Sequence, residues 1–155
     1  MGYRKFGKDR HRPPGEWVQT TEVESVVGIQ YRKAAAQAFA IAVEQAERSG
    51  LSYGLQLELQ PNHPQDANAI AVYGVAECKR WLRGPLRREW LVGYLVREMA
   101  AEVHEELISK SVSIAAELYE IYEGDGGFID IKYFVLAPPG HSASVRRRAR
   151  TARSS

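Results

Sequence analysis

One stretch of the chain, Gln60 to Tyr73, constrains the fold more than any other, and it reads QPNHPQDANAIAVY. Its first half is rich in Pro, Asn and Asp, and its second half is an apolar run with β-branched and aromatic residues. This change of composition predicts a rigid loop that leads directly into a buried strand. Pro61 and Pro64 each restrict φ to about −65°, and Asp66 can accept a hydrogen bond from a nearby backbone amide in an Asx turn. Such a loop can present side chains to a ligand, or it can be an ordinary turn.

The hydrophobic pattern on both sides of this loop predicts an α+β fold. Apolar residues recur with helical spacing over 33–48 and 96–108, which predicts two helices. Alternating or continuous apolar runs predict strands within 16–29 and over 53–60, 69–75, 90–95, 112–118 and 128–136, the last two joined by a Gly-rich turn. This order suits a small, twisted or barrel-like antiparallel sheet of about six strands with two covering helices.

Composition places the chain among globular proteins of one domain. Hydrophobic residues make up 45% and charged residues 26% of the 155 residues, which is enough for a core without disulfides or metals. No run approaches the roughly 18 apolar residues of a membrane helix, and the basic N-terminus has no apolar segment typical of a signal peptide. Cys78 is the single cysteine, so an internal disulfide is excluded and a reducing compartment is favoured. We therefore expect a cytoplasmic protein with no membrane contact.

Charge is distributed very unevenly along the chain. Residues 1–14 carry five Lys or Arg against one Asp, residues 141–155 carry five Arg and no acid, and the stretch between them has a net charge of −7. We expect a folded domain over 16–138, flanked by a basic disordered arm (1–15) and a basic disordered tail (139–155). Such arms attract polyanions. They can equally serve as solubilising extensions or contact the acidic body of the protein.

A second basic segment lies inside the predicted domain. Glu77 is followed by CKRWLRGPLRR, in which Gly84-Pro85 predicts a turn and therefore a protruding hairpin or loop. Cations interleaved with an exposed indole suit phosphate contact and base stacking, which makes Trp81 and Arg83 candidate nucleic-acid ligands. In the alternative interpretation, Trp81 folds back on the body and the arginines pair with its acids.

Several short motifs, in order and at their spacings, resemble those of the HIRAN domain, a module of fork-remodelling helicase-like proteins in eukaryotes and a lone or fused module in bacteria. The similarity covers about 26–135 and rests on Val27-Gly28 before Tyr31, the loop from Asn62 to Ile70, and Val92-Gly93-Tyr94-Leu95 followed by Arg97-Glu98. The resemblance implies a compact β-barrel related to the OB fold, with two helices. It also implies binding of single-stranded DNA, at the 3′ end in the eukaryotic members.

The resemblance assigns roles to particular residues. Asp66 matches a position at which a carboxylate meets the terminal nucleotide, and Tyr31 matches an adjacent aromatic residue that can stack on a base. Tyr94 stands where DNA-binding members can carry histidine. Two positions depart from the pattern, because Gln30 replaces an arginine and Gln65 replaces an aromatic residue. These departures remove a phosphate partner and a stacking surface.

The sequence therefore predicts a non-catalytic nucleic-acid-binding module that recognises single-stranded DNA, at 3′ ends, in DNA repair or replication. The expected partners are single-stranded DNA and a helicase or other protein, with no cofactor. The predicted DNA-binding residues are Tyr31, Arg32, Asp66, Asn68, Tyr94, Trp81 and Arg83.

Two other classes remain as alternatives. The glutamines at 30 and 65 favour a protein-interaction or assembly module that has lost DNA-end binding. A metal-dependent nuclease is disfavoured because the carboxylates that could hold Mg²⁺ lack a recognisable spacing; these are Asp66, Glu98, Asp125 and Asp130. Nucleophile, phosphate-loop and His/Cys metal motifs are absent from the sequence.

Overall fold

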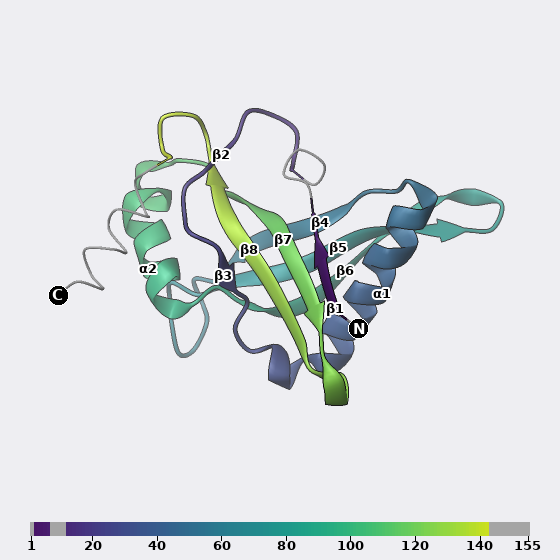
Figure 1. Cartoon of the computed structure of the whole chain (residues 1–155). Coiled ribbons are helices and arrows are strands. Elements are labelled where there is room, and N and C mark those ends of the chain that lie inside the picture. Colours follow the sequence, from purple (N-terminus) through teal and green to yellow (C-terminus); the bar gives the residue numbers. More distant parts are fainter. Residues whose placement is uncertain (1, 7–11, 143–155) are drawn as a thin grey trace.

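A computed structural model describes residues 2–6 and 12–142, which form an α+β fold of two antiparallel sheets and two α-helices (Figure 1). The first sheet has three strands in the order β4 (Tyr53–Leu59), β5 (Ile70–Arg80) and β6 (Arg83–Tyr94). The second is built on β7 (Ala115–Glu123) and β8 (Ile129–Ala137). Short strands complete it: β1 (Gly2–Lys5) pairs with β7, and β2 (Val18–Gln19) and β3 (Glu24–Ser25) pair with β8.

An isolated antiparallel bridge between Val27 and Tyr94 joins the two sheets. Each residue donates its backbone N–H to the carbonyl of the other, with N···O distances of 2.9 Å. Because Val27 follows β3 closely and Tyr94 ends β6, the bridge continues the strand pairing from one sheet to the other. The sheets consequently curl around a common core in a half-barrel (Figure 1).

Helix α1 (Lys33–Ser49) covers the first sheet. Its buried face, which includes Ala36, Phe39 and Val43, follows the helical spacing that the sequence predicts. The ring of Phe39 lies directly over Gly74 of β5, where a Cβ atom would come within 2.4 Å of the ring. The helix ends at Gly50, whose left-handed φ of 69° suits a C-terminal glycine.

Helix α2 (Arg97–Glu106) follows β6 directly and buries Ala100 and Val103. It lies at the opposite end of the molecule from the β5–β6 turn (Figure 1). Three short 3-10 helices complete the described elements: η1 (Ile29–Tyr31), η2 (Ile108–Lys110) and η3 (Asp125–Gly127). None of the described helices is both long and apolar enough to cross a membrane.

The core lies between the two sheets and α1. Its largest fully buried apolar side chains come from α1, β5, β7, β8 and the residue after α2, and they are Phe39, Ile70, Leu107, Leu118, Ile121, Ile131, Tyr133 and Leu136. Burial raises the pKa of the Tyr133 phenol well above its ordinary value, so the hydroxyl stays protonated. This hydroxyl lies 3.4 Å from the Met99 sulfur of α2, which ties α2 to the second sheet.

The predicted helices and the strand over 53–60 are confirmed as α1, α2 and β4. The strand expected within 16–29 is instead divided into β2, β3 and the bridge at Val27. The strands expected over 69–75 and 90–95 are much longer, because both extend into the basic hairpin.

The expectation of a disordered N-terminal arm is wrong for residues 2–5, which form β1. Gly2 pairs with Glu123 and Lys5 pairs with Glu120. Side-chain contacts support this pairing, since the Tyr3 ring lies 4.7 Å from that of Tyr122. Residues 7–11 of the arm and 143–155 of the tail lie outside the described residues.

The basic segment forms the predicted protruding hairpin, but its turn is not at Gly84-Pro85. Arg80 pairs with Arg83, so the two residues of the turn are Trp81 and Leu82. Pro85 lies within β6, which is an edge strand of the three-stranded sheet. A proline is tolerated there because an edge strand does not need every N–H group for pairing.

Candidate nucleic-acid interface

The loop before β5, the segment around η1 and the end of β6 meet at Tyr94. Gly93 permits this meeting, because a Cβ atom at that position would lie 2.3 Å from the Val27 carbonyl oxygen. Val27 can therefore approach β6 closely enough to form its bridge with Tyr94. The bridge in turn places Tyr31 and Arg32, a few residues further along the chain, beside the end of β6.

Tyr94 is in contact with side chains from both neighbouring segments. The guanidinium carbon of Arg32 lies 5.2 Å from the centre of its ring, and the His63 ring approaches it edge-on at 5.6 Å. Its hydroxyl donates a hydrogen bond to Gln60 Oε1 over 3.1 Å. We call Arg32, Gln60, His63 and Tyr94 the Tyr94 cluster. Cation–π attraction and the hydrogen bond hold these side chains in one arrangement.

Tyr31 is the sequence neighbour of Arg32 in the Tyr94 cluster and is 82% exposed. A tyrosine at this position could be explained by ordinary packing at the edge of the core, but the exposure of Tyr31 contradicts that interpretation. It does hold in part for Tyr94, which is half-buried. An exposed phenol beside a cation is suited to stacking on a planar ligand.

The loop from Gln60 to Ala69 is closed by its own hydrogen bonds. The Gln60 N–H donates to the Ala69 carbonyl over 2.9 Å, and the Ala69 N–H donates to the Asp66 carbonyl over 3.1 Å. Asp66 Oδ1 accepts the Asn68 N–H over 2.9 Å, which confirms that Asp66 makes an Asx turn. The Asn68 residue itself is exposed. These bonds make the loop rigid, as its proline content predicts.

The second carboxylate oxygen of Asp66 faces a cation. Asp66 Oδ2 lies 3.8 Å from Arg97 Nε at the start of α2, and the Asp66 side chain is 20% exposed. One oxygen is thus committed to the turn, and the other is shared with an exposed arginine. A hydroxyl or amine donor that reached this edge would meet Oδ2.

The two residues that depart from the HIRAN pattern, Gln30 and Gln65, are both exposed. Neither offers a charge or an aromatic surface. The cations at this site are instead Arg32, within the Tyr94 cluster, and Arg97, beside Asp66. Arg32 has no carboxylate within 4.0 Å among the residues that the structure describes.

Trp81 and Arg83 are not part of this arrangement. They lie at the tip of the β5–β6 hairpin, and at about 3.3 Å per residue β6 separates Arg83 from Tyr94 by roughly 35 Å. Trp81 is 88% exposed, so the alternative in which it folds back on the body is wrong. Arg87 donates to Gln56 of β4, but the acid that it pairs with at 3.2 Å is Glu89 of its own strand and not an acid of the body. The seven predicted DNA-binding residues thus fall into two separate groups.

The N-terminal arginines contact the acidic body of the protein. Arg4 pairs with Glu123 of β7 and with Glu44 of α1. Arg12 pairs with Glu117, whose side chain is 2% exposed. For these two arginines the alternative of contact with the body is confirmed, and their charges are already neutralised.

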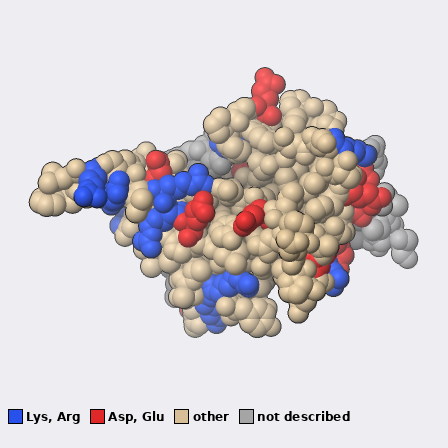
Figure 2. Space-filling model, turned by 180° about the vertical axis from the view of Figure 1, so that it is seen from behind, with Lys and Arg blue, Asp and Glu red and all other residues tan. Residues whose placement is uncertain are grey.

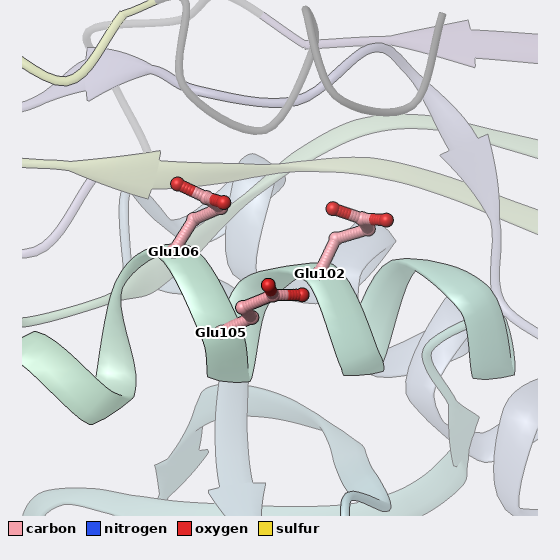
Figure 3. Close-up of side chains that lie close together, drawn as sticks. All are labelled: Glu102, Glu105 and Glu106. Carbon is pink, nitrogen blue, oxygen red and sulfur yellow. The ribbon is translucent and has the colours of Figure 1, made fainter. Parts of the chain in front are cut away.

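The carboxylates considered for a metal site do not gather in the described part of the chain. The one group found there is Glu102, Glu105 and Glu106, whose oxygens lie within 4.8 Å of one another (Figure 3). All three come from one face of α2 and are not joined by a histidine, a cysteine or a carboxylate of another element. Glu106 also pairs with Lys110 at 3.5 Å. Glu105 is exposed, whereas Glu102 and Glu106 are half-buried, so the expectation that all three face water holds for Glu105 alone.

Sequence reasoning did not assign roles to His63, Gln60 and Arg97. His63 and Arg97 belong to the motifs that carry the HIRAN resemblance, but only the fold shows that they lie beside Tyr94 and Asp66. With Arg32, Tyr94 and Asp66, these residues offer aromatic surface, two cations and a carboxylate on the segments that meet at Tyr94. No family model matches the chain, and neither the curated proteins nor the solved structures contain a significant match to it.

Proposed function

We propose that the chain is a non-catalytic module that binds the 3′ end of single-stranded DNA at the Tyr94 cluster. The observation that carries the proposal is the 82% exposure of Tyr31, next to an arginine that has no acidic partner in the described chain. A large aromatic side chain in this position offers stacking that any base can use.

A strand end presents a terminal base, a free hydroxyl and phosphates behind them. Tyr31 stacks on the terminal base, which is worth about 1–3 kcal/mol. Arg32 and Arg97 attract the phosphates, and Asp66 Oδ2 accepts the 3′-hydroxyl. The Asx turn at Asp66 and the bridge at Val27 keep these groups in place before the DNA arrives, so little conformational freedom is lost on binding.

The proposal includes an OB-like barrel of the HIRAN type. The curled antiparallel sheets with two helices support it, as do the motif positions of Val27-Gly28, the loop up to Ile70, and Gly93-Tyr94. It also includes a role in DNA repair or replication beside a helicase, in the cytoplasm, where the free thiol of Cys78 is stable.

Fluorescence anisotropy tests the proposal with short labelled single strands that end in a 3′-hydroxyl or a 3′-phosphate. The full chain should prefer the hydroxyl, because a terminal phosphate is repelled by Asp66. Asp66→Asn keeps an acceptor for the Asx turn and removes the charge, so it should abolish the preference without unfolding the loop. Tyr31→Ala should weaken binding at least about fivefold, and Tyr3→Ala, at a tyrosine that is 66% exposed on β1, should not.

Equal affinity for both ends, or an unchanged affinity of Tyr31→Ala, would contradict the proposal. If the full chain binds no single strand at all, the exposed Gln30 and Gln65 favour the second candidate, a protein-interaction module.

A further inference from the structure

The distal half of the β5–β6 hairpin is a two-stranded ribbon that projects beyond the body. We call residues 77–89 the ribbon arm. Glu77 pairs with Arg87, Cys78 with Leu86 and Arg80 with Arg83, and a register shift lies between the last two pairs. Figure 1 shows that the arm extends past α1, and the residues from Lys79 to Glu89 are all exposed. Most side chains of the arm therefore do not pack against the rest of the described chain.

The arm is strongly cationic along its length. It carries five Lys or Arg against two Glu, and Lys79, Arg80, Arg83 and Arg88 have no carboxylate within 4.0 Å among the described residues. Arg83 and Arg88 are separated by about 17 Å of strand. Lys79 and Arg80 are successive residues of β5, so strand alternation places them on opposite faces of the ribbon. Figure 2 shows Lys and Arg side chains along the projecting arm, whose outer end carries no charged side chain.

The uncharged end consists of two large apolar residues. Trp81 is 88% exposed and Leu82 is 83% exposed. Leu82 also adopts a left-handed φ of 61°, which is unfavourable for a branched side chain. A soluble hairpin gains nothing from Trp-Leu at its turn, where Asn-Gly would be less strained and better solvated. The tip is therefore suited to insertion into an apolar environment.

We propose that the ribbon arm binds duplex DNA, with its cations on the flanking phosphates and Trp81-Leu82 inserted between base pairs as a wedge. A two-stranded ribbon fits a DNA groove, and apolar side chains can partly unstack a base step. A loop that inserts into a membrane surface would need its cations in a single belt at headgroup depth. The spread of charge along both faces of the arm fits the two phosphate backbones of a groove instead.

This site is separate from the Tyr94 cluster and does not rest on the function proposed above. The test uses the full chain and a covalently closed dumbbell duplex, which has no strand ends, with 2-aminopurine beside a flexible TA step. Binding should raise the 2-aminopurine fluorescence, because a wedge unstacks the base. Trp81→Ala with Leu82→Ala should abolish this rise and weaken binding at least about fivefold. Ile41→Ala, which removes an exposed apolar side chain from α1, should change neither.

The charged part of the arm is tested by salt dependence. Replacing Lys79 and Arg83 by Ser should reduce the slope of log K against log salt by about 1.8, at about 0.9 per phosphate contact. Replacing the exposed Arg48 and Lys110 by Ser should leave the slope unchanged. The proposal is overturned if neither pair of arm substitutions alters dumbbell binding. It is also overturned if the tip residues are needed for anionic phosphatidylserine vesicles while the dumbbell is not bound. Failure of the Tyr94 cluster to bind strand ends would affect none of these results.

Discussion

Replacing Gly93 by alanine should separate the two sheets where they join. The new methyl carbon would lie 2.3 Å from the Val27 carbonyl oxygen and 2.6 Å from Val26 Cγ1. Neither neighbour is the free end of a flexible side chain, since one is backbone and the other belongs to a buried, β-branched residue. The segment before η1 must therefore move away from β6.

The expected cost follows from what this movement breaks. The Val27–Tyr94 bridge contains two backbone hydrogen bonds of 2.9 Å, each worth about 0.5–1.5 kcal/mol net. Added bulk at a packed position costs a further 1–3 kcal/mol or so. Because a shift that relieves the clash also lengthens the bonds, the two costs overlap. We expect Gly93→Ala to lower the free energy of unfolding by about 2–4 kcal/mol.

Urea denaturation of the full chain measures this change, with Gly84→Ala as a matched control in the same strand. A Cβ atom at Gly84 meets nothing within 4 Å, so this control should equal or slightly exceed the parent protein in stability. Gly93→Ala should also weaken single-strand binding, since Tyr31 and Arg32 lose their support. A difference of under about 1 kcal/mol between the two alanine variants would refute the reasoning.

Three further predictions concern other parts of the fold. The Ser52 hydroxyl and N–H donate to Glu77 Oε1 over 2.7 and 2.9 Å. These hydrogen bonds hold the pKa of the Glu77 carboxyl in the folded protein below its ordinary value. The ionised carboxyl therefore stabilises the fold above the unfolded pKa, and this stabilisation is lost as the pH falls through the folded pKa. Ser52→Ala should raise the pKa in a carbon-detected NMR titration, and an unshifted titration would show that these bonds do not lower it. Arg12→Ala should lower the free energy of unfolding in urea by about 2 kcal/mol, because it removes a charged partner of the buried Glu117. The double variant Arg12→Met with Glu117→Leu should recover much of this loss. Equal stability of the single and double variants would argue against a buried ion pair. Leu82→Gly should stabilise the chain by roughly 0.5 kcal/mol through relief of its left-handed backbone, and a lower melting temperature would contradict that.

The sequence pattern predicted those elements whose formation depends on residues close together in the chain. Helix α1 was predictable because its apolar spacing and Gly50 are both short-range signals. Strand β4 was predictable from strict alternation, although Leu59 at its end is 42% exposed. The Asx turn at Asp66 belongs to the same class, since it depends on a residue two positions away.

Features that depend on distant partners were not predictable. Strand β1 has an ordinary basic sequence and becomes a strand because β7 offers a free edge and the carboxylate of Glu123. The position of the hairpin turn was wrong because a Gly-Pro pair is the stronger turn signal, whereas the register of β5 with β6 places the turn at Trp81-Leu82.

The candidate site was also only partly predictable, because its arrangement depends on residues distant in sequence. The pattern indicated Tyr31, Asp66 and Tyr94 individually, and the bridge at Val27 shows why two of the three segments involved adjoin. The sequence pattern could not show that Trp81 lies far from these residues, because that separation is set by the length of β6. The strand expected over 90–95 did not reach the hairpin.

The pairing of β1 with β7 also bears on how the chain folds as it is synthesised. Gly2–Lys5 leaves the ribosome well before its partners, Glu120–Glu123, which lie about 118 residues further along the chain. At a translation rate of about 5–20 residues per second, the first strand waits roughly 6–25 s for its place in the sheet. During this time the edge of β7 does not yet exist, and the nascent β1 segment, with Tyr3 and Arg4, can contact chaperones or other nascent chains.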